Sequence, residues 1–191
     1  RFGARSIGWR GQDGDMSMTG AAAPDEEAGE EGSLSRVLAT SPGLMLVAVA
    51  LGVMWATELI DLIAPGQPLD RWGIRPRSWR GLVGIPLAPF LHFGFRHLIS
   101  NSIPFALLGA AIALGGRQRI VEVIFTTGVV SGAGVWVFGR SNSIHLGASG
   151  VVFGFITYLV SRGFFAKRLW WILGGAIVAI AYGGSLIWGI V

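Results

Sequence analysis

Apolar residues in this chain gather into five long runs that are separated by shorter polar segments. The runs cover roughly residues 43–63, 97–115, 120–139, 146–161 and 169–190. A helix needs about 20 consecutive apolar residues to cross the hydrocarbon core of a bilayer. Each run approaches or reaches that length, so the pattern predicts an all-α, polytopic membrane helical bundle.

The segments outside these runs predict a tail and an interfacial loop. Residues 1–40 have no apolar period and are first basic and then acidic. We expect them to form a disordered N-terminal tail, followed by a transmembrane domain over 41–191. Residues 64–96 form a long loop in which arginines alternate with Trp72 and Trp79. Arginine and tryptophan beside an apolar stretch are typical of a segment that lies in the membrane interface.

Composition supports the membrane assignment. Charged residues make up only 14% of the 191 residues and hydrophobic residues 52%, so there are too few charges to coat a soluble domain. The net charge of +4 comes from arginines that lie between apolar runs, which indicates topology and headgroup contacts and not a nucleic-acid partner. Positive residues divide equally between the two sides, so the positive-inside rule leaves the orientation open.

Residue usage also limits the chemistry and the source. The chain has no cysteine, which excludes thiol nucleophiles and cysteine-ligated metals. We expect no metal and no cofactor. Lys167 is the only lysine against fourteen arginines, a bias typical of a GC-rich genome, so we expect a multi-pass protein of a bacterial inner (plasma) membrane.

Polar side chains at membrane depth are costly and are therefore candidates for function. Glu58 and Asp61 lie at the end of the first run, beside the arginine-rich loop, and Glu122 lies near the start of the third. We interpret all three as charges at helix ends. We expect Glu58 and Asp61 to pair with loop arginines.

A second group of polar residues suggests catalysis. His97 and Asn101 are four residues apart and so share one helix face, while Ser149 stands in the stretch from Gly147 to Gly150 at the start of the fourth run. The second and fourth spans run in the same direction, which places both groups at one depth. A helix start offers backbone N–H groups without intrahelical partners, as from Ala148, and His97 and Asn101 could add donors for an oxyanion.

Structural interpretations of the same residues remain open. His97 and Asn101 could hydrogen-bond a neighbouring helix, and Gly150 with Gly154 has the GxxxG spacing of a packing face. In a chain with 30 glycines, a GxSG motif alone is a weak signal. The coincidence of both patterns is the informative feature.

Together these residues resemble the rhomboid intramembrane serine proteases. The likeness extends over 43–191 and rests on Trp79-Arg80 in the first loop, His92, the pair His97 and Asn101, and residues 142–150. The resemblance implies that Ser149 is the nucleophile, that His97 and Asn101 help to form the oxyanion hole, and that Phe153 packs against the base. It also implies that the substrates are single-span membrane proteins.

One feature departs from the family pattern. The family's general base is a histidine on a sixth span, whereas five spans are expected here, so we expect the base beyond Val191 and an incomplete domain at the C-terminus. The 191-residue chain alone should be inactive. His145 precedes Ser149 by four residues across a turn, and we interpret it as a loop histidine that supports the active-site turn.

Other functions remain as alternatives. A catalytically inactive rhomboid-like protein that binds or escorts membrane helices is the main one, although it would not need an oxyanion hole. A metalloprotease would need a motif such as HExxH, an aspartyl protease would need two carboxylates meeting at depth, and a channel would need a polar stripe along a span. None of these patterns is present.

Overall fold

The architecture is that of a computed structural model, which describes residues 41–66, 68–167, 173, 176, 177 and 180. Its main elements, in chain order, are α2 (Pro42–Ile63), the short helix η1 (Leu69–Trp72), α3 (Trp79–Leu87), η2 (Ala88–Phe90), α4 (Phe95–Ala113), α5 (Arg117–Phe138) and α6 (Ser149–Phe165). In the described part of the chain no strand is present, and Ile74 with His145 forms an isolated β-bridge. The predicted all-α helical bundle is therefore confirmed.

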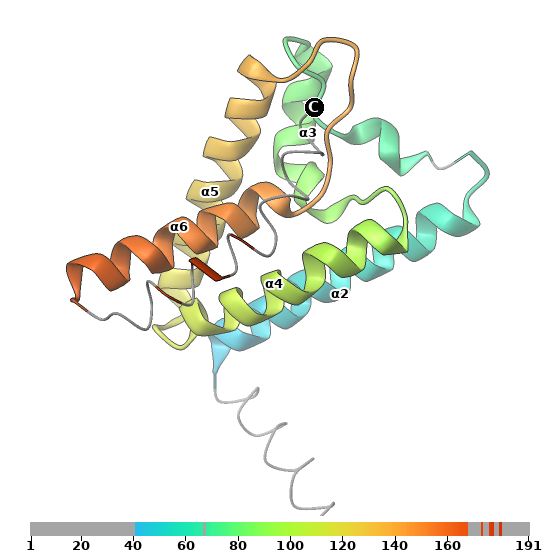
Figure 1. Cartoon of the computed structure of the whole chain (residues 1–191). Coiled ribbons are helices and arrows are strands. Elements are labelled where there is room, and N and C mark those ends of the chain that lie inside the picture. The colour runs from blue at the N-terminus through green and yellow to red at the C-terminus, as the bar shows by residue number, and fades with distance from the viewer. Residues whose placement is uncertain (1–40, 67, 168–172, 174–175, 178–179, 181–191) are drawn as a thin grey trace, which may run out of the picture.

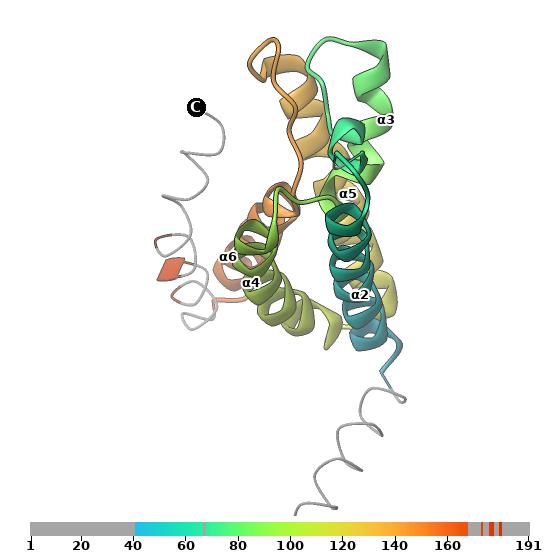
Figure 2. The same cartoon turned by 90° about the vertical axis from the view of Figure 1, so that its right-hand side faces the viewer.

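The four long helices pack in a ring, in which α4 contacts α2 and α6, and α5 contacts the same two helices (Figures 1 and 2). Their apolar side chains meet in one core. Its most deeply buried members are Leu98 and Ile112 of α4, Phe155 of α6, Met54 of α2 and Ile120 of α5. The ring places the start of α4 beside the start of α6, which are the two helix ends that the sequence analysis singled out.

Two of the described helices are long and apolar enough to cross a membrane, α2 and α5. The pair formed by α3–η2 and α4 passes the same test together but is bent by 70° at residues 91–94. The helix α6 is apolar but has only 17 residues, about 25 Å at 1.5 Å per residue. The predicted fifth span, 169–190, falls outside the described residues apart from isolated positions.

Helix starts differ from the predicted ones by a few residues. The helix α4 begins at Phe95 because Gly94, with φ of +86°, turns the chain out of the preceding loop. The helix α6 begins at Ser149 and not at 146, because the backbone of His145 pairs with Ile74 and the N–H of Gly147 donates to Ala88. Ser149 is therefore the first residue of its helix.

The predicted interfacial loop is largely structured. The helix α3 lies against α5, and η2 packs against α2 and α6 (Figure 1). Trp72 and Trp79 are 55% and 84% exposed, as expected for side chains that face lipid or headgroups, although Gly73, Ile74 and Ala88 of the same loop are buried.

Candidate active site

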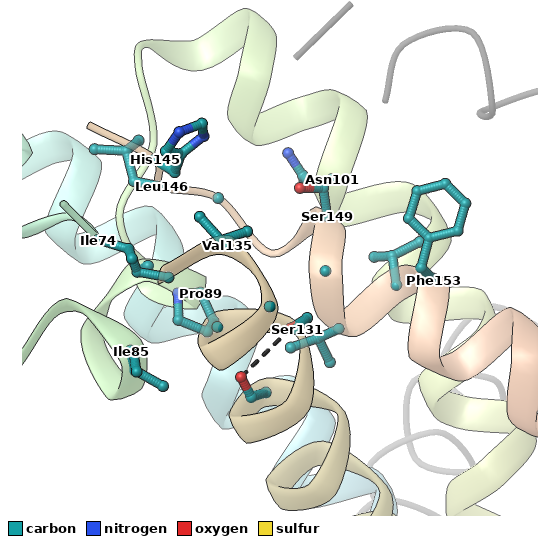
Figure 3. Close-up of a pocket in the computed structure, with 18 of the residues that line it drawn as sticks. Ile74, Ile85, Pro89, Asn101, Ser131, Val135, His145, Leu146, Ser149 and Phe153 are labelled. Carbon is teal, nitrogen blue, oxygen red and sulfur yellow. Dashed lines mark hydrogen bonds between the residues drawn. The ribbon is translucent and has the colours of Figure 1, made fainter. Parts of the chain in front are cut away.

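A cavity of about 700 Å³ lies between α3–η2, α4, α5 and the turn that leads into α6 (Figure 3). Seven of the eight candidate residues from the sequence line this cavity, namely His97, Asn101, His145, Gly147, Ser149, Gly150 and Phe153. The eighth, Ala148, is fully buried behind the cavity wall. The structure therefore brings together residues that lie up to 56 positions apart in the sequence, from His97 to Phe153.

Ser149 lies where backbone donors are available. The N–H groups of Ser149, Gly150 and Val151 belong to the first turn of α6 and have no intrahelical acceptor. The preceding N–H, of Gly147, donates to the carbonyl oxygen of Ala88 at 2.8 Å. In the described part of the chain, no backbone acceptor takes the N–H of Ala148 or Ser149. Both groups belong to the residues at the N-terminus of α6 and are free to donate beside the hydroxyl-bearing residue.

The side chains of His97 and Asn101 are held by hydrogen bonds in and just before the first turn of α4. The N–H of Phe93 donates to Nδ1 of His97 at 3.4 Å, so in the neutral imidazole the proton sits on Nε2, which can donate. Nδ2 of the buried Asn101 donates to the carbonyl oxygen of His97 at 2.9 Å. Because an amide nitrogen has two protons, one further donor remains on Asn101.

Gly147 is the residue at which the α4 side chains contact the turn that leads to Ser149. Its φ of +113° belongs to the region that favours glycine. A Cβ atom at this position would come within 2.6 Å of Cε1 of His97 and 3.6 Å of Nδ2 of Asn101. The imidazole thus lies against the backbone two residues before Ser149.

The glycine after the serine has a different neighbour. A Cβ on Gly150 would meet Oγ of Ser131 on α5 at 2.6 Å, and one on Gly154 would clash with Thr127. Gly150 and Gly154 therefore form a close contact between α5 and α6, as the structural interpretation of the GxxxG spacing predicted. The same motif serves both packing and the cavity wall.

His145 is held in the turn before α6. Its backbone pairs with Ile74 in both directions. Its Nε2 lies 2.7 Å from Oγ of Ser143, whose hydroxyl also lies 2.6 Å from the carbonyl oxygen of Arg140. The single hydroxyl proton goes to that carbonyl, so His145 donates to Ser143 through Nε2. Burial lowers the pKa of His145 from its ordinary value, which keeps the ring neutral at physiological pH.

Phe153 borders the cavity, whereas His92 lies outside its lining. Phe153 stands one turn after Ser149 on α6 and borders the cavity (Figure 3). His92 is buried outside the lining, with its ring edge-on to that of His97 at a centroid distance of 5.2 Å. It therefore contacts the site through His97.

Several cavity residues were not apparent from the sequence. The walls opposite Ser149 come from the first loop and from the end of α5, and include Ile74, Ile85, Pro89, Val135 and Phe138. Arg77, with φ of +55°, donates through its guanidinium to the carbonyl oxygens of Val137 and Gly139 and to Oγ of Ser141. This arginine ties the first loop to the end of α5. The signal in the sequence was only a proline-broken apolar run preceded by arginines.

The expected pairing of Glu58 and Asp61 with loop arginines is wrong. Both side chains are buried, at 5% and 4% exposure, and within the described residues their neighbours are backbone N–H groups and other carboxyl groups, not arginines. Asp61 instead accepts the backbone N–H of Leu69 at 2.7 Å. Glu122 is exposed and accepts from Gln118 at 2.8 Å, which fits a helix-end charge.

Comparison with known proteins gives one family match. Residues 77–191 match the model of the Rhomboid domain. Uncharacterized proteins of Mycobacterium tuberculosis and Mycobacterium bovis are 38% identical over 148 residues, which is 75% of this chain and 60% of theirs. An uncharacterized Mycobacterium leprae protein is 35% identical over 162 residues, 82% of this chain and 64% of its own.

A more distant relative has an informative name. A Bacillus subtilis protein whose name marks it as a candidate rhomboid protease is 35% identical over 83 residues, 43% of this chain and 40% of that protein. No solved structure matches the chain significantly. The chain spans about 60% of the length of its mycobacterial relatives.

Proposed function

The chain belongs to the rhomboid family, and we propose that it is an intramembrane serine endopeptidase that cleaves single-span membrane proteins. Ser149 is the proposed nucleophile, and His97, Asn101 and the backbone N–H of Ala148 or Ser149 are the proposed oxyanion donors. The proposed location is a bacterial plasma membrane, in keeping with the bacterial relatives.

The proposed chemistry follows acyl transfer. Oγ of Ser149 bonds to the scissile carbonyl carbon while its proton passes to a histidine base. The oxyanion that forms is stabilised by the donors around Gly147. The base returns the proton to the leaving amine as the C–N bond breaks, and water then hydrolyses the ester to regenerate the serine.

None of the three histidines in the described region suits the role of base. Nδ1 of His97 accepts from Phe93, and Nε2 of His145 donates to Ser143. His92 is buried outside the cavity. We therefore propose a base histidine on a further helix, beyond Val191, as the resemblance to the family implies.

The observation that supports this proposal most is the position of Ser149. A serine at the first position of an apolar helix, facing a cavity that His97 and Asn101 also line, has backbone and side-chain donors within its reach. A protein that only binds membrane helices has no need for that convergence of donors.

The test uses the full-length protein in liposomes with a model single-span substrate. Ser149→Ala should abolish cleavage and leave the melting temperature unchanged, because alanine suits a position next to packed glycines. Ser161→Ala, on the exposed face of the same helix, is the matched control and should cleave normally. Cleavage that persists in Ser149→Ala refutes the assignment, and a wild-type protein that binds but never cleaves supports the non-catalytic alternative.

A further inference from the structure

The sharp bend at residues 91–94 determines where the α4 residues of the site lie. The chain turns by 70° between η2 and α4 at this bend. His97 follows three residues after Gly94, and the imidazole of His92, within the bend, lies edge-on against His97. A shift of the bend would therefore move His97 relative to Ser149.

Adjacent residues of α2 lie beside both ends of the bend. Oγ1 of Thr57 lies 2.6 Å from the carbonyl oxygen of Phe90, just before the bend. The carboxyl group of Glu58 lies near the backbone N–H of Gly94, where α4 begins, and near the carboxyl groups of Asp61 and Asp70. One turn of α2 thus contacts the chain on either side of His92.

A neighbouring pair of contacts continues along α4. The indole of Trp55 lies against the ring of Phe95 at a centroid distance of 6.0 Å, and its Nε1 donates to Oγ of Ser102 at 3.2 Å. The C-terminal part of α2 therefore packs along the first two turns of α4, which contain both His97 and Asn101. These contacts define α4 in position and in rotation about its axis.

Packing alone does not account for Glu58. A carboxyl group at 5% exposure inside a membrane helix is costly unless it is used. The side chain is placed beside the start of α4, near Gly94, although its Oε2 has no hydrogen-bond partner among the described residues. A carboxylate beside the N-terminal N–H groups of a helix is also favourable to the helix dipole.

We propose that Thr57 and Glu58 are positioning residues, which fix the bend before α4 and so hold His97 and Asn101 at the oxyanion. This inference rests on the proposed function. It adds to that function two residues of the first span that do not line the cavity.

The experiment measures kcat and KM for the full-length protein in liposomes with a model single-span substrate. Thr57→Val and Glu58→Met remove the hydroxyl donor and the carboxylate acceptor with little change in size. Thr57→Ser and Glu58→Gln keep a donor and an acceptor in place. Matched controls are Thr127→Val, where the hydroxyl bonds only within α5, and Glu122→Met on the exposed face of α5.

We expect Thr57→Val and Glu58→Met to lower kcat about 10-fold or more while KM stays within about twofold, since small misplacements of catalytic groups cost rate. Thr57→Ser, Glu58→Gln and both controls should retain the wild-type kcat. Equal losses in the controls, or an unchanged kcat in both Thr57→Val and Glu58→Met, overturn the inference. So does a failure of both variants to fold, because α2 would then hold the fold and not the site. A wild-type protein without any cleavage refutes the proposed function instead.

Discussion

The imidazole of His97 lies directly against the backbone of Gly147, so close that a methyl group at Gly147 would stand 2.6 Å from its Cε1. His97 belongs to α4 and Gly147 to the turn before α6, 50 positions further along the chain. Their contact joins the start of α4 to the turn before Ser149. In the proposed mechanism this is where the side-chain and backbone donors to the oxyanion converge.

The first prediction follows from that contact. Gly147→Ala combines a left-handed φ with a clash against His97, so we expect turnover to fall by about 100-fold or more, as for displaced catalytic groups. Cleavage of a model substrate in liposomes is the measurement. Gly52→Ala, on the exposed side of α2 where an added Cβ meets no atom within 4 Å, is the control and should be neutral. Full activity in Gly147→Ala would contradict the proposed arrangement.

A second prediction concerns Asn101. Loss of one oxyanion donor typically costs about 10² to 10³ in rate, so Asn101→Ala should lower kcat far more than it changes KM. Asn101 also bonds the carbonyl oxygen of His97, so the variant's melting temperature has to be measured beside its kinetics. Unchanged kcat with a raised KM would mean that Asn101 only positions substrate.

The helical period made the α4 residues of the site visible in the sequence. Residues four apart on a helix share one face, so His97 and Asn101 were expected to lie together. A serine at the start of an apolar run lies at a helix end whatever the tertiary packing. The direction of successive spans then placed both groups on one side of the bundle. These inferences needed only local pattern and topology.

The remaining walls of the cavity could not be inferred, because loop conformation depends on individual bonds between side chains and backbone. Arg77 sets the course of the first loop through the carbonyl oxygens of Val137 and Gly139, which lie 60 and 62 residues away at the end of α5. Glu58 was misread for the same reason. Nearness in sequence to several arginines suggested ion pairs, whereas the fold directs the side chain inward to Gly94.

A third prediction concerns the first loop. Trp72 and Trp79 are exposed on a segment that contacts the end of α5, and we expect both to lie at headgroup depth on the face where the active site opens. The chain has no cysteine, so single cysteines at 72 and 79 can be spin-labelled and their depth measured in liposomes. A label at buried Ile74 is the control and should be shielded from lipid and water. Shielded labels at 72 and 79 would contradict the interfacial placement.

The last prediction concerns the general base. A serine hydroxyl needs an adjacent base to become a nucleophile at neutral pH. Burial lowers the pKa of His145 from its ordinary 6.5, so a reaction that used His145 as base would lose rate only as the pH falls below about 6.5. His145→Asn would abolish such a reaction. We expect instead that the full-length His145→Asn variant is still labelled at Ser149 by a fluorophosphonate. The acidic limb of the variant's pH–rate profile should also match that of the wild-type protein.

The complementary measurement compares fluorophosphonate labelling in a shorter and a longer form of the protein. Residues 1–191 alone should label negligibly with the same probe, whereas the protein extended through a further helix should label at Ser149. Ser149→Ala is the control in both forms and should remain unlabelled. If residues 1–191 label as fast as the extended protein, one of their own histidines is the base. In that case His145 is the first candidate, because its ring already borders the cavity that Ser149 faces, and its bond to Ser143 would have to break or reverse during catalysis.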